Sequence, residues 1–151
     1  MTPGGSRQFL AGFDALTQAV RRARGANGRG PEGGLTLSQY GLLEVLAEQP
    51  SARVQELAAH AGVTASTATR ILDALERRRI VRRTRLDEDR RAVAVSLTNT
   101  GRQLVCEERD WLRGRERAFF AALPTGEQAL APDLLFRLAA LIDELAAGPE
   151  H

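Results

Sequence analysis

Small hydroxyl side chains and one arginine lie close together in the middle of the chain, at Ser66, Thr67, Thr69 and Arg70. Hydroxyl groups can bond phosphates or base edges, and an arginine can bind O6 and N7 of guanine with two hydrogen bonds. If these residues begin a helix, the positive end of its dipole also favours a nearby phosphate. Their chemistry therefore suits nucleic-acid recognition, although Ser and Thr also cap and solvate ordinary helices.

An arginine-rich segment follows these residues. Between Arg70 and Arg91 there are nine arginines and only five acids. Arg90 and Arg91 come directly after an acidic run, and arginines at the tip of a hairpin can enter a minor groove, where negative potential favours them. With Thr64 and Arg85, these residues complete the set that we expect at a DNA interface.

Two short helices are predicted to position the hydroxyl residues. Val54–Ala61 has apolar residues at helical spacing, and Gly62 supplies the left-handed conformation that favours a helix end. Thr64 is a good N-cap for a second helix over Ala65–Arg78. Its inward positions are predicted to be Ala68, Ile71, Leu72 and Leu75. Two short helices joined by a tight glycine-containing turn are typical of a helix-turn-helix.

The pattern then changes from helical spacing to alternation. This change predicts two antiparallel strands, about Arg82–Leu86 and Ala92–Leu97, with Asp87–Arg91 as the tip of the hairpin. Ser51–Arg53 is a candidate for a further short strand beside it.

The remainder of the chain is predicted to be mainly helical. One helix runs from Ser6, its expected N-cap, to about Arg24, and the glycine-rich stretch Gly25–Gly34 is a loop. Thr36 and Gln39 can form a capping box for a helix that ends at Pro50. The inward residues of that helix are predicted to include Leu37, Tyr40 and Leu43.

A long helix is expected from Asn99 or Thr100 to about Leu123, where Pro124 breaks it. Thr125 and Gln128 offer another capping box, although Pro132 implies that the final helix is regular only from there. The final helix has leucines at heptad-like spacing, which suits either a helical partner or packing within the chain. These leucines are Leu134, Leu138, Leu141 and Leu145.

The motif Asp89-x-Arg91, followed by an alternating apolar run into Leu97-Thr98 and then Gly101, resembles the wing of the MarR family of bacterial transcription regulators. The preceding segment, GVTASTATRILDALERRRIVRR, is similar to that family's recognition helix and its exit. The resemblance covers the chain from about Leu35 to Gly101 in order. The remaining helices fit by layout only.

This resemblance implies a mainly α-helical fold with a small β wing. Residues 1–151 would form one domain, with a winged helix-turn-helix at 36–98 and dimerisation helices at 6–24 and 99–147. Arg91, with Arg90, would be the wing arginine, and Asp89 would hold the wing's shape by pairing with a nearby arginine. Ser66, Thr67 and Arg70 fall where the family's recognition helix meets DNA.

The resemblance also implies a homodimer that reads two half-sites of a pseudo-palindromic duplex about one helical turn apart. Family members are more often repressors than activators. They usually respond to a small, often aromatic or phenolic ligand, which lodges between the DNA-binding and dimerisation parts. No cofactor and no metal is expected.

Composition is compatible with this interpretation. The chain has 151 residues and a net charge of +2, and its 21 basic residues are all arginine. The middle third is basic and the last third acidic, as expected if a DNA-facing body carries a dimerisation arm turned away from phosphate. A single cysteine excludes an intramolecular disulfide framework. Without an 18-residue apolar run or a secretory leader, the protein is expected to be cytoplasmic.

Other classes of function remain as alternatives. Cys106 could sense oxidants, although Glu107 and Glu108 beside it oppose thiolate formation and favour a structural role. His60 has only His151 as a further histidine, which argues against a metal site. No pairing of nucleophile and base supports an enzyme. A winged helix that binds only protein is a further alternative, but it would have no need of arginines at its wing tip.

Overall fold

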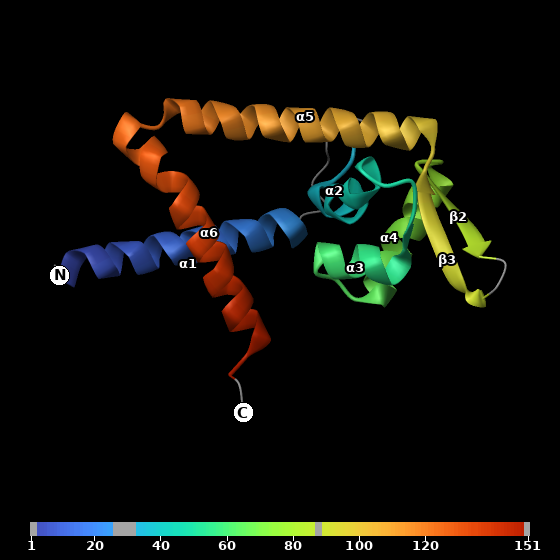
Figure 1. Ribbon diagram of the computed structural model, residues 1–151, viewed down its shortest axis with the longest axis horizontal. Coiled ribbons are helices and arrows are strands. Elements are labelled where there is room, and N and C mark those ends of the chain that lie inside the picture. Colours follow the sequence, from blue (N-terminus) through green and yellow to red (C-terminus); the bar gives the residue numbers. More distant parts are fainter. Residues whose placement is uncertain (1–2, 26–32, 87–88, 150–151) are drawn as a thin grey trace. The chain divides into compact units, whose positions relative to one another are not determined.

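The computed structural model describes residues 3–25, 33–86 and 89–149, without the side chains of residues 3 and 89–91 (Figure 1). The chain forms two units, which divide between Arg109 and Asp110 within one long helix. In chain order the elements are α1 Pro3–Gly25, α2 Leu37–Leu43, the 3₁₀ helix η1 Glu44–Ala47, β1 Ala52–Arg53, α3 Val54–Ala61, α4 Ala65–Arg77, β2 Val81–Leu86, β3 Asp89–Leu97, α5 Asn99–Ala122 and α6 Thr125–Ala147. This order confirms the predicted fold class, mainly helical with a small β wing.

The three strands form one antiparallel sheet in the order β1-β3-β2. Ala52 pairs with Val95, so the short strand predicted at 51–53 is confirmed. Val81 pairs with Leu97 at the other side of β3, which confirms the predicted hairpin. We call the β2–β3 hairpin the wing.

The start of β3 differs from the prediction. β3 begins at Asp89 rather than Ala92, because Leu86 pairs with Asp89 after an irregularity in register between Arg85 and Leu86. The backbone of residues 90 and 91 therefore belongs to a strand, and the prediction that they form the tip was wrong. Residues 87 and 88 lie outside the described part of the chain.

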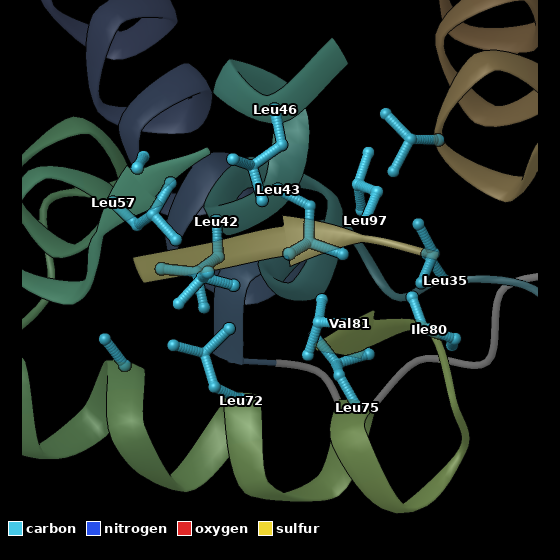
Figure 2. Packing of buried hydrophobic residues seen from close by; sticks show 14 of the residues in the cluster. Leu35, Leu42, Leu43, Leu46, Leu57, Leu72, Leu75, Ile80, Val81 and Leu97 are labelled. Atoms are coloured by element: carbon cyan, nitrogen blue, oxygen red, sulfur yellow. The ribbon is translucent and has the colours of Figure 1, made fainter. Parts of the chain in front are cut away.

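A cluster of buried apolar side chains joins the helix-turn-helix, the sheet and the start of α5 (Figure 2). Each fully buried leucine or valine contributes about 1.5–3 kcal/mol to folding. From α4 the cluster includes Ala68, Leu72 and Leu75, as predicted, whereas Ile71 is only partly buried. The largest buried side chains are Leu35, Leu42, Leu43, Leu46, Leu57, Leu72, Leu75, Ile80, Val95 and Val105.

The capping box that begins α2 is confirmed. The Thr36 hydroxyl accepts a hydrogen bond from the Gln39 amide at 3.1 Å, and the Gln39 side chain accepts one from the Thr36 amide at 3.0 Å. The predicted inward face was wrong at Leu37, which is 44% exposed, and Leu42 is buried instead. The α-helix lasts only to residue 43 and continues as η1 to residue 47, so the prediction that one helix runs as far as Pro50 was wrong.

Two positions in the helix-turn-helix region adopt the left-handed conformation. Gly62 ends α3 with φ of 70°, as the sequence predicts. Arg79, which follows α4, has φ of 58° and is the one non-glycine residue with positive φ in the described part of the chain. A left-handed residue with a side chain carries a strain of roughly 1 kcal/mol. The Ile80 amide donates to the Leu75 carbonyl at 2.9 Å, so the helix end is hydrogen-bonded around this strained residue.

Helix α5 begins directly against the turn between α4 and β2. The Thr98 hydroxyl donates to the Arg79 carbonyl at 2.6 Å, and the Thr98 amide donates to the Ile80 carbonyl at 3.1 Å. The Gly101 amide in turn donates to the Thr98 hydroxyl at 3.0 Å. A Cβ atom at Gly101 would lie 2.0 Å from the Ile80 oxygen, so only glycine allows this approach.

One charged residue is buried near this junction. Glu108 of α5 is 8% exposed and lies seven residues after Gly101, on the face that also carries the buried Val105. Burial raises the pKa of the Glu108 carboxyl, because the charged form loses its hydration.

The second unit contains the remainder of α5 and α6, joined through Pro124. The Gln128 side-chain amide donates to the carbonyls of Phe120 at 3.1 Å and Leu123 at 3.0 Å, and so caps the end of α5. The predicted capping box of Thr125 with Gln128 was therefore wrong. The prediction that the last helix becomes regular only from Pro132 was also wrong, because α6 runs through that residue from Thr125.

Large apolar side chains remain exposed along α1 and the second unit. Helix α1 begins at Pro3, so Ser6 lies inside it and is not its N-cap. No described residue of α6 is buried, although many of its side chains are apolar. The exposed large side chains on these elements are Phe9, Leu10, Leu16, Val20, Trp111, Phe119, Phe120, Leu130, Leu134, Leu135, Phe136, Leu141, Ile142 and Leu145.

We predict that Gly101→Ala lowers the free energy of unfolding by about 3 kcal/mol, because the added methyl group collides with the Ile80 carbonyl. Gly114→Ala is the control on the same helix. Apart from its own helix backbone, no atom of the described residues lies within 4 Å of its added Cβ, so this change should stabilise the protein by roughly 0.5–1 kcal/mol. Chemical denaturation would measure both, and equal stability of the two variants would contradict the close approach at Gly101.

Candidate nucleic-acid interface

The outward face of α4 carries three of the predicted interface residues. Ser66, Thr69 and Arg70 are exposed near the N-terminal end of the helix. Spacings of three and four residues place them on one face, opposite the buried side of α4. We call these three residues the reading face. They present two hydroxyls and one guanidinium close to the positive end of the helix dipole.

Thr64 and Thr67 have a different role in the structure. The Thr64 hydroxyl accepts a hydrogen bond from the Thr67 amide at 3.1 Å and donates one to the Thr67 hydroxyl at 3.0 Å. Thr64 is therefore the N-cap of α4, as predicted, and Thr67 is partly buried beside it. The two threonines fix the first turn, which positions the reading face.

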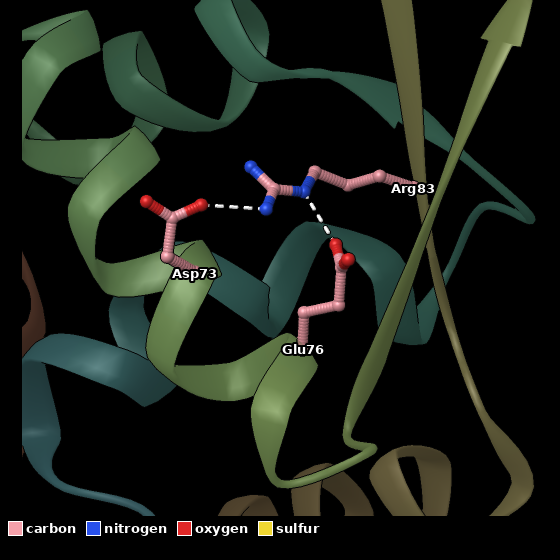
Figure 3. Close-up of polar contacts among 3 residues, drawn as sticks. All are labelled: Asp73, Glu76 and Arg83. Carbon is pink, nitrogen blue, oxygen red and sulfur yellow. Dashed lines mark hydrogen bonds and ion pairs between the residues drawn. The ribbon is translucent and has the colours of Figure 1, made fainter.

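The wing is joined to α4 by an arginine that the sequence analysis did not single out. Arg83 of β2 reaches across to α4, where its Nε donates to Glu76 and its Nη2 to Asp73, both at 2.5 Å (Figure 3). We call this arrangement the arginine clamp. The hydrogen bond that Arg83 donates to Glu76, with a smaller contribution from the one to Asp73, raises the pKa of the Arg83 guanidinium. The two carboxylates therefore stabilise the charged form of Arg83.

A sequence signal for the clamp exists but is weak. Arg83 lies two residues after the buried Val81, so strand alternation places it on the side of the sheet that faces the core. A charged residue at such a position needs a partner. Which acid supplies it depends on how β2 lies against α4, and this is not a local property of the sequence.

A groove of about 750 Å³ lies between the N-terminus of α3, the outward face of α4 and the wing. It brings Thr69 of the reading face together with Arg85 of β2, two residues that the sequence analysis proposed for the interface. Arg53, the last residue of β1, and Gln55, in the first turn of α3, also line it. Arg53 is exposed and is the N-cap residue of α3, with no capping bond from its side chain. Among the residues that the structure describes, the groove is therefore lined by three arginines, counting Arg83, and one acid, Glu76.

Three predicted residues fall outside the described side chains. Asp89, Arg90 and Arg91 have a described backbone in β3, but their side chains are not described. The expected pairing of Asp89 with an arginine and the reach of the two wing arginines therefore remain predictions.

Arg78 makes hydrogen bonds within the protein that stabilise the fold. Its Nη2 donates to the carbonyls of Gly33 at 2.9 Å and Gly34 at 3.0 Å. This contact holds the chain before α2 against the end of α4.

The residues weighed for metal or redox chemistry lie elsewhere. His60 pairs with Glu44 at 2.5 Å on the exposed surface. Cys106 is partly buried, and Arg109 Nη2 lies 3.9 Å from its sulfur. Within the described ranges, no group of three or more His, Cys, Asp or Glu side chains could hold a metal ion. None of the described helices is long and apolar enough to cross a bilayer.

Comparison with known proteins gives a consistent result. The sequence model of the MarR family matches residues 35–93, which run from the start of α2 into the wing. No curated protein sequence matches the chain.

Solved structures match over most of the chain. A probable transcriptional regulator from Pseudomonas aeruginosa is 30% identical, with a TM-score of 0.64, covering 84% of this chain and 95% of that one. FabT from Streptococcus pneumoniae, solved in complex with DNA, is 19% identical, with a TM-score of 0.72, and covers 95% of this chain and 99% of its own. BpsR from Bordetella bronchiseptica, whose DNA binding is regulated by 6-hydroxynicotinic acid, is 24% identical, with a TM-score of 0.66, covering 83% and 96%.

The capping role of Thr64 can be separated from the DNA contact predicted for Ser66. We predict that Thr64→Ala lowers the free energy of unfolding by about 1 kcal/mol, because α4 loses its N-cap. Ser66→Ala, two residues away and exposed, should change stability by less than about 0.5 kcal/mol and should weaken DNA binding. Thermal unfolding and fluorescence anisotropy would measure the two effects. A loss of stability in Ser66→Ala equal to that in Thr64→Ala would contradict this division.

Proposed function

The chain belongs to the MarR family of DNA-binding transcription regulators, and we propose that it is a homodimeric repressor that binds a pseudo-palindromic operator and is released by a small ligand. The observation that carries this proposal is the reading face of α4 beside the arginine-lined groove. Regulators of this family are generally not enzymes. FabT, a protein with the same fold, has been solved bound to DNA, which supports a DNA partner for this chain too.

The reading face is proposed to enter the major groove. Arg70 is the residue suited to a guanine, with two hydrogen bonds to O6 and N7, and Ser66 and Thr69 are suited to phosphates or base edges. Thr64 and Thr67 contribute by holding the first turn of α4 through the cap described above. The N-terminal end of a recognition helix is the part that usually contacts bases in helix-turn-helix proteins.

The wing is proposed to reach the adjacent minor groove. Arg90 and Arg91 would supply the positive charge there, and Asp89 would stabilise the wing by pairing with an arginine. The DNA strand that separates the two grooves must then pass between α4 and the wing, where the arginine-lined groove lies. We assign Arg53 and Arg85, which line that groove from opposite sides, to its phosphates.

The uncovered apolar side chains support a homodimer. In the second unit no described residue of α6 is buried, and Phe136 is 77% exposed, so this helix lacks a core of its own within one chain. Helix α1 adds exposed apolar residues such as Phe9 and Leu10. We propose that residues 6–24 and 99–147 bury these faces against a second copy. Monomeric proteins rarely leave so many large apolar side chains exposed along neighbouring stretches of helix.

We base the proposed release from DNA by a small ligand on a protein of the same fold and on a thermodynamic condition. A regulator of the same fold, BpsR, has its DNA binding regulated by an aromatic acid, 6-hydroxynicotinic acid. An effector of similar chemistry would release this protein only if it bound the DNA-free geometry more tightly than the DNA-bound one.

A DNA titration tests the proposal. The protein should prefer the duplex upstream of its own gene over a random duplex, with two chains per site, and affinity should fall steeply with salt. Arg70→Ala should reduce affinity for the upstream duplex by about 1–3 kcal/mol and relax its sequence preference. Arg91→Ala should weaken binding to both duplexes and lower the salt dependence by about one unit. Wild-type protein that binds neither duplex at low salt would instead favour a winged helix that binds protein.

Oligomeric state provides a separate test. We predict that Leu141→Asp shifts the dimer towards monomer, because a charge would enter the apolar face of α6. Glu144→Gln, an exposed change on the same helix, is the control and should leave the dimer intact. Truncation after Leu123 should give monomeric or insoluble protein. Sedimentation velocity would measure all three, and a stable dimer from the truncated chain would place the interface elsewhere.

A further inference from the structure

The DNA-facing side of α4 carries two acids as well as the reading face. Asp73 lies seven residues after Ser66, and Glu76 lies seven residues after Thr69. Seven residues are nearly two helical turns, so these carboxylates continue the same face of the helix. Their side chains are 47% and 45% exposed. Left unpaired, they would place two negative charges in line with residues that approach a polyanion.

Arg83 pairs with both of these acids from the neighbouring wing (Figure 3). We infer that Arg83 is a positioning residue for DNA binding, which reduces the negative charge of Asp73 and Glu76 towards DNA and fixes the wing against α4. This inference rests on the proposed function, since it concerns the same DNA-binding surface. It assigns Arg83 a role that differs from that of the arginines proposed to touch DNA.

The effect of Arg83 on the negative charge of α4 follows from the range of electrostatic interactions in salt solution. At 0.1 M salt the Debye length is about 10 Å, so exposed carboxylates on α4 would still repel phosphates that reach the groove. Arg83 leaves a net charge of one negative unit on the three side chains, whereas its loss would leave two. Conversely, replacing both acids by amides would leave one positive charge in the groove. Binding that depends only on the phosphate backbone should follow this change of sign.

The positioning part follows from the sheet topology. Among the described strands, β2 is an edge strand that pairs with β3 alone, so the hydrogen bonds of the sheet do not tie it to α4. Arg83 lines both the large groove and a second hollow of about 330 Å³ that also involves Asp73, Glu76 and Arg77. Its side chain, like that of Glu76, thus lines both hollows. Without the arginine clamp, the angle between the wing and the reading face would be less well defined.

Arg82 offers a matched control on the same strand. It is exposed and precedes Arg83, so strand alternation directs its side chain to the other side of the sheet. Arg82→Ala removes the same charge from the same strand and leaves the arginine clamp in place. It therefore corrects for the general loss of positive charge.

The test compares wild type, Arg83→Ala, the double variant D73N/E76Q and Arg82→Ala in full-length protein, titrated with upstream and random duplexes at about 0.1 M salt. Arg83→Ala should bind random duplex roughly five- to tenfold more weakly, and D73N/E76Q should bind it more tightly by a similar factor. Both should lose about tenfold of the preference for the upstream duplex, because both release the wing. Arg82→Ala should bind both duplexes within about threefold of wild type and keep the preference.

These opposite effects distinguish the inference from a purely structural role, which would weaken binding to both duplexes in every clamp variant. Unchanged or weaker random-duplex binding by D73N/E76Q would overturn the charge effect, and this variant decides the point even if Arg83→Ala fails to fold. A retained preference for the upstream duplex in D73N/E76Q would overturn the positioning effect. Absence of binding by wild type would count against the proposed function itself.

Discussion

The carbonyl group of Ile80 is the point at which the DNA-binding part and the long helix α5 meet. It accepts hydrogen bonds from the amide and the hydroxyl of Thr98, both at 3.1 Å, and it lies so close to Gly101 that no side chain fits there. The same turn contains the strained Arg79, whose carbonyl accepts a further bond from the Thr98 hydroxyl. Because α4 ends and both β2 and α5 begin around this turn, one small group of backbone contacts joins the end of α4 to the start of both elements. The Thr-x-x-Gly sequence at residues 98–101 is thus explained by packing against the turn between α4 and β2, without reference to DNA.

The two ends of α4 carry different polar side chains. The N-terminal end presents hydroxyls and Arg70, supported by a cap that uses two threonines. The C-terminal end carries acids that are paired across to the wing and Arg78, which is bonded to the chain before α2. The polar groups at that end therefore link elements of the protein to one another, whereas the residues proposed to contact bases lie in the first two turns. Such a separation allows the reading residues to vary without loss of the contacts that hold the helix in place.

Local features were predictable from the sequence, and features set by tertiary contacts were not. The cap at Thr64, the capping box at Thr36 and the left-handed Gly62 each depend on a few adjacent residues, and all three are confirmed. Gln128 was misassigned because its side chain could cap either of two adjoining helices, and it binds the preceding one. The helix predicted to end at Pro50 changes to a 3₁₀ turn after residue 43, which helical periodicity does not anticipate. Arg83 was missed because its partners lie on another element, and the roles of the wing arginines stay predictions.

The buried Glu108 makes folding a proton-coupled process near the start of α5. Since burial raises the pKa of this carboxyl, the folded chain holds the proton more tightly than the unfolded chain. The contribution of Glu108 to folding stability is therefore fully present at a pH below the pKa of this carboxyl in the unfolded chain. It is lost as the pH rises through the pKa of the same carboxyl in the folded chain. Surface ion pairs have the opposite dependence, because acid neutralises their carboxylates. Acidification thus weakens the polar links on the surface of this protein while it relieves the desolvation of a buried charge, and the net acid sensitivity of the regulator depends on the balance between these two effects.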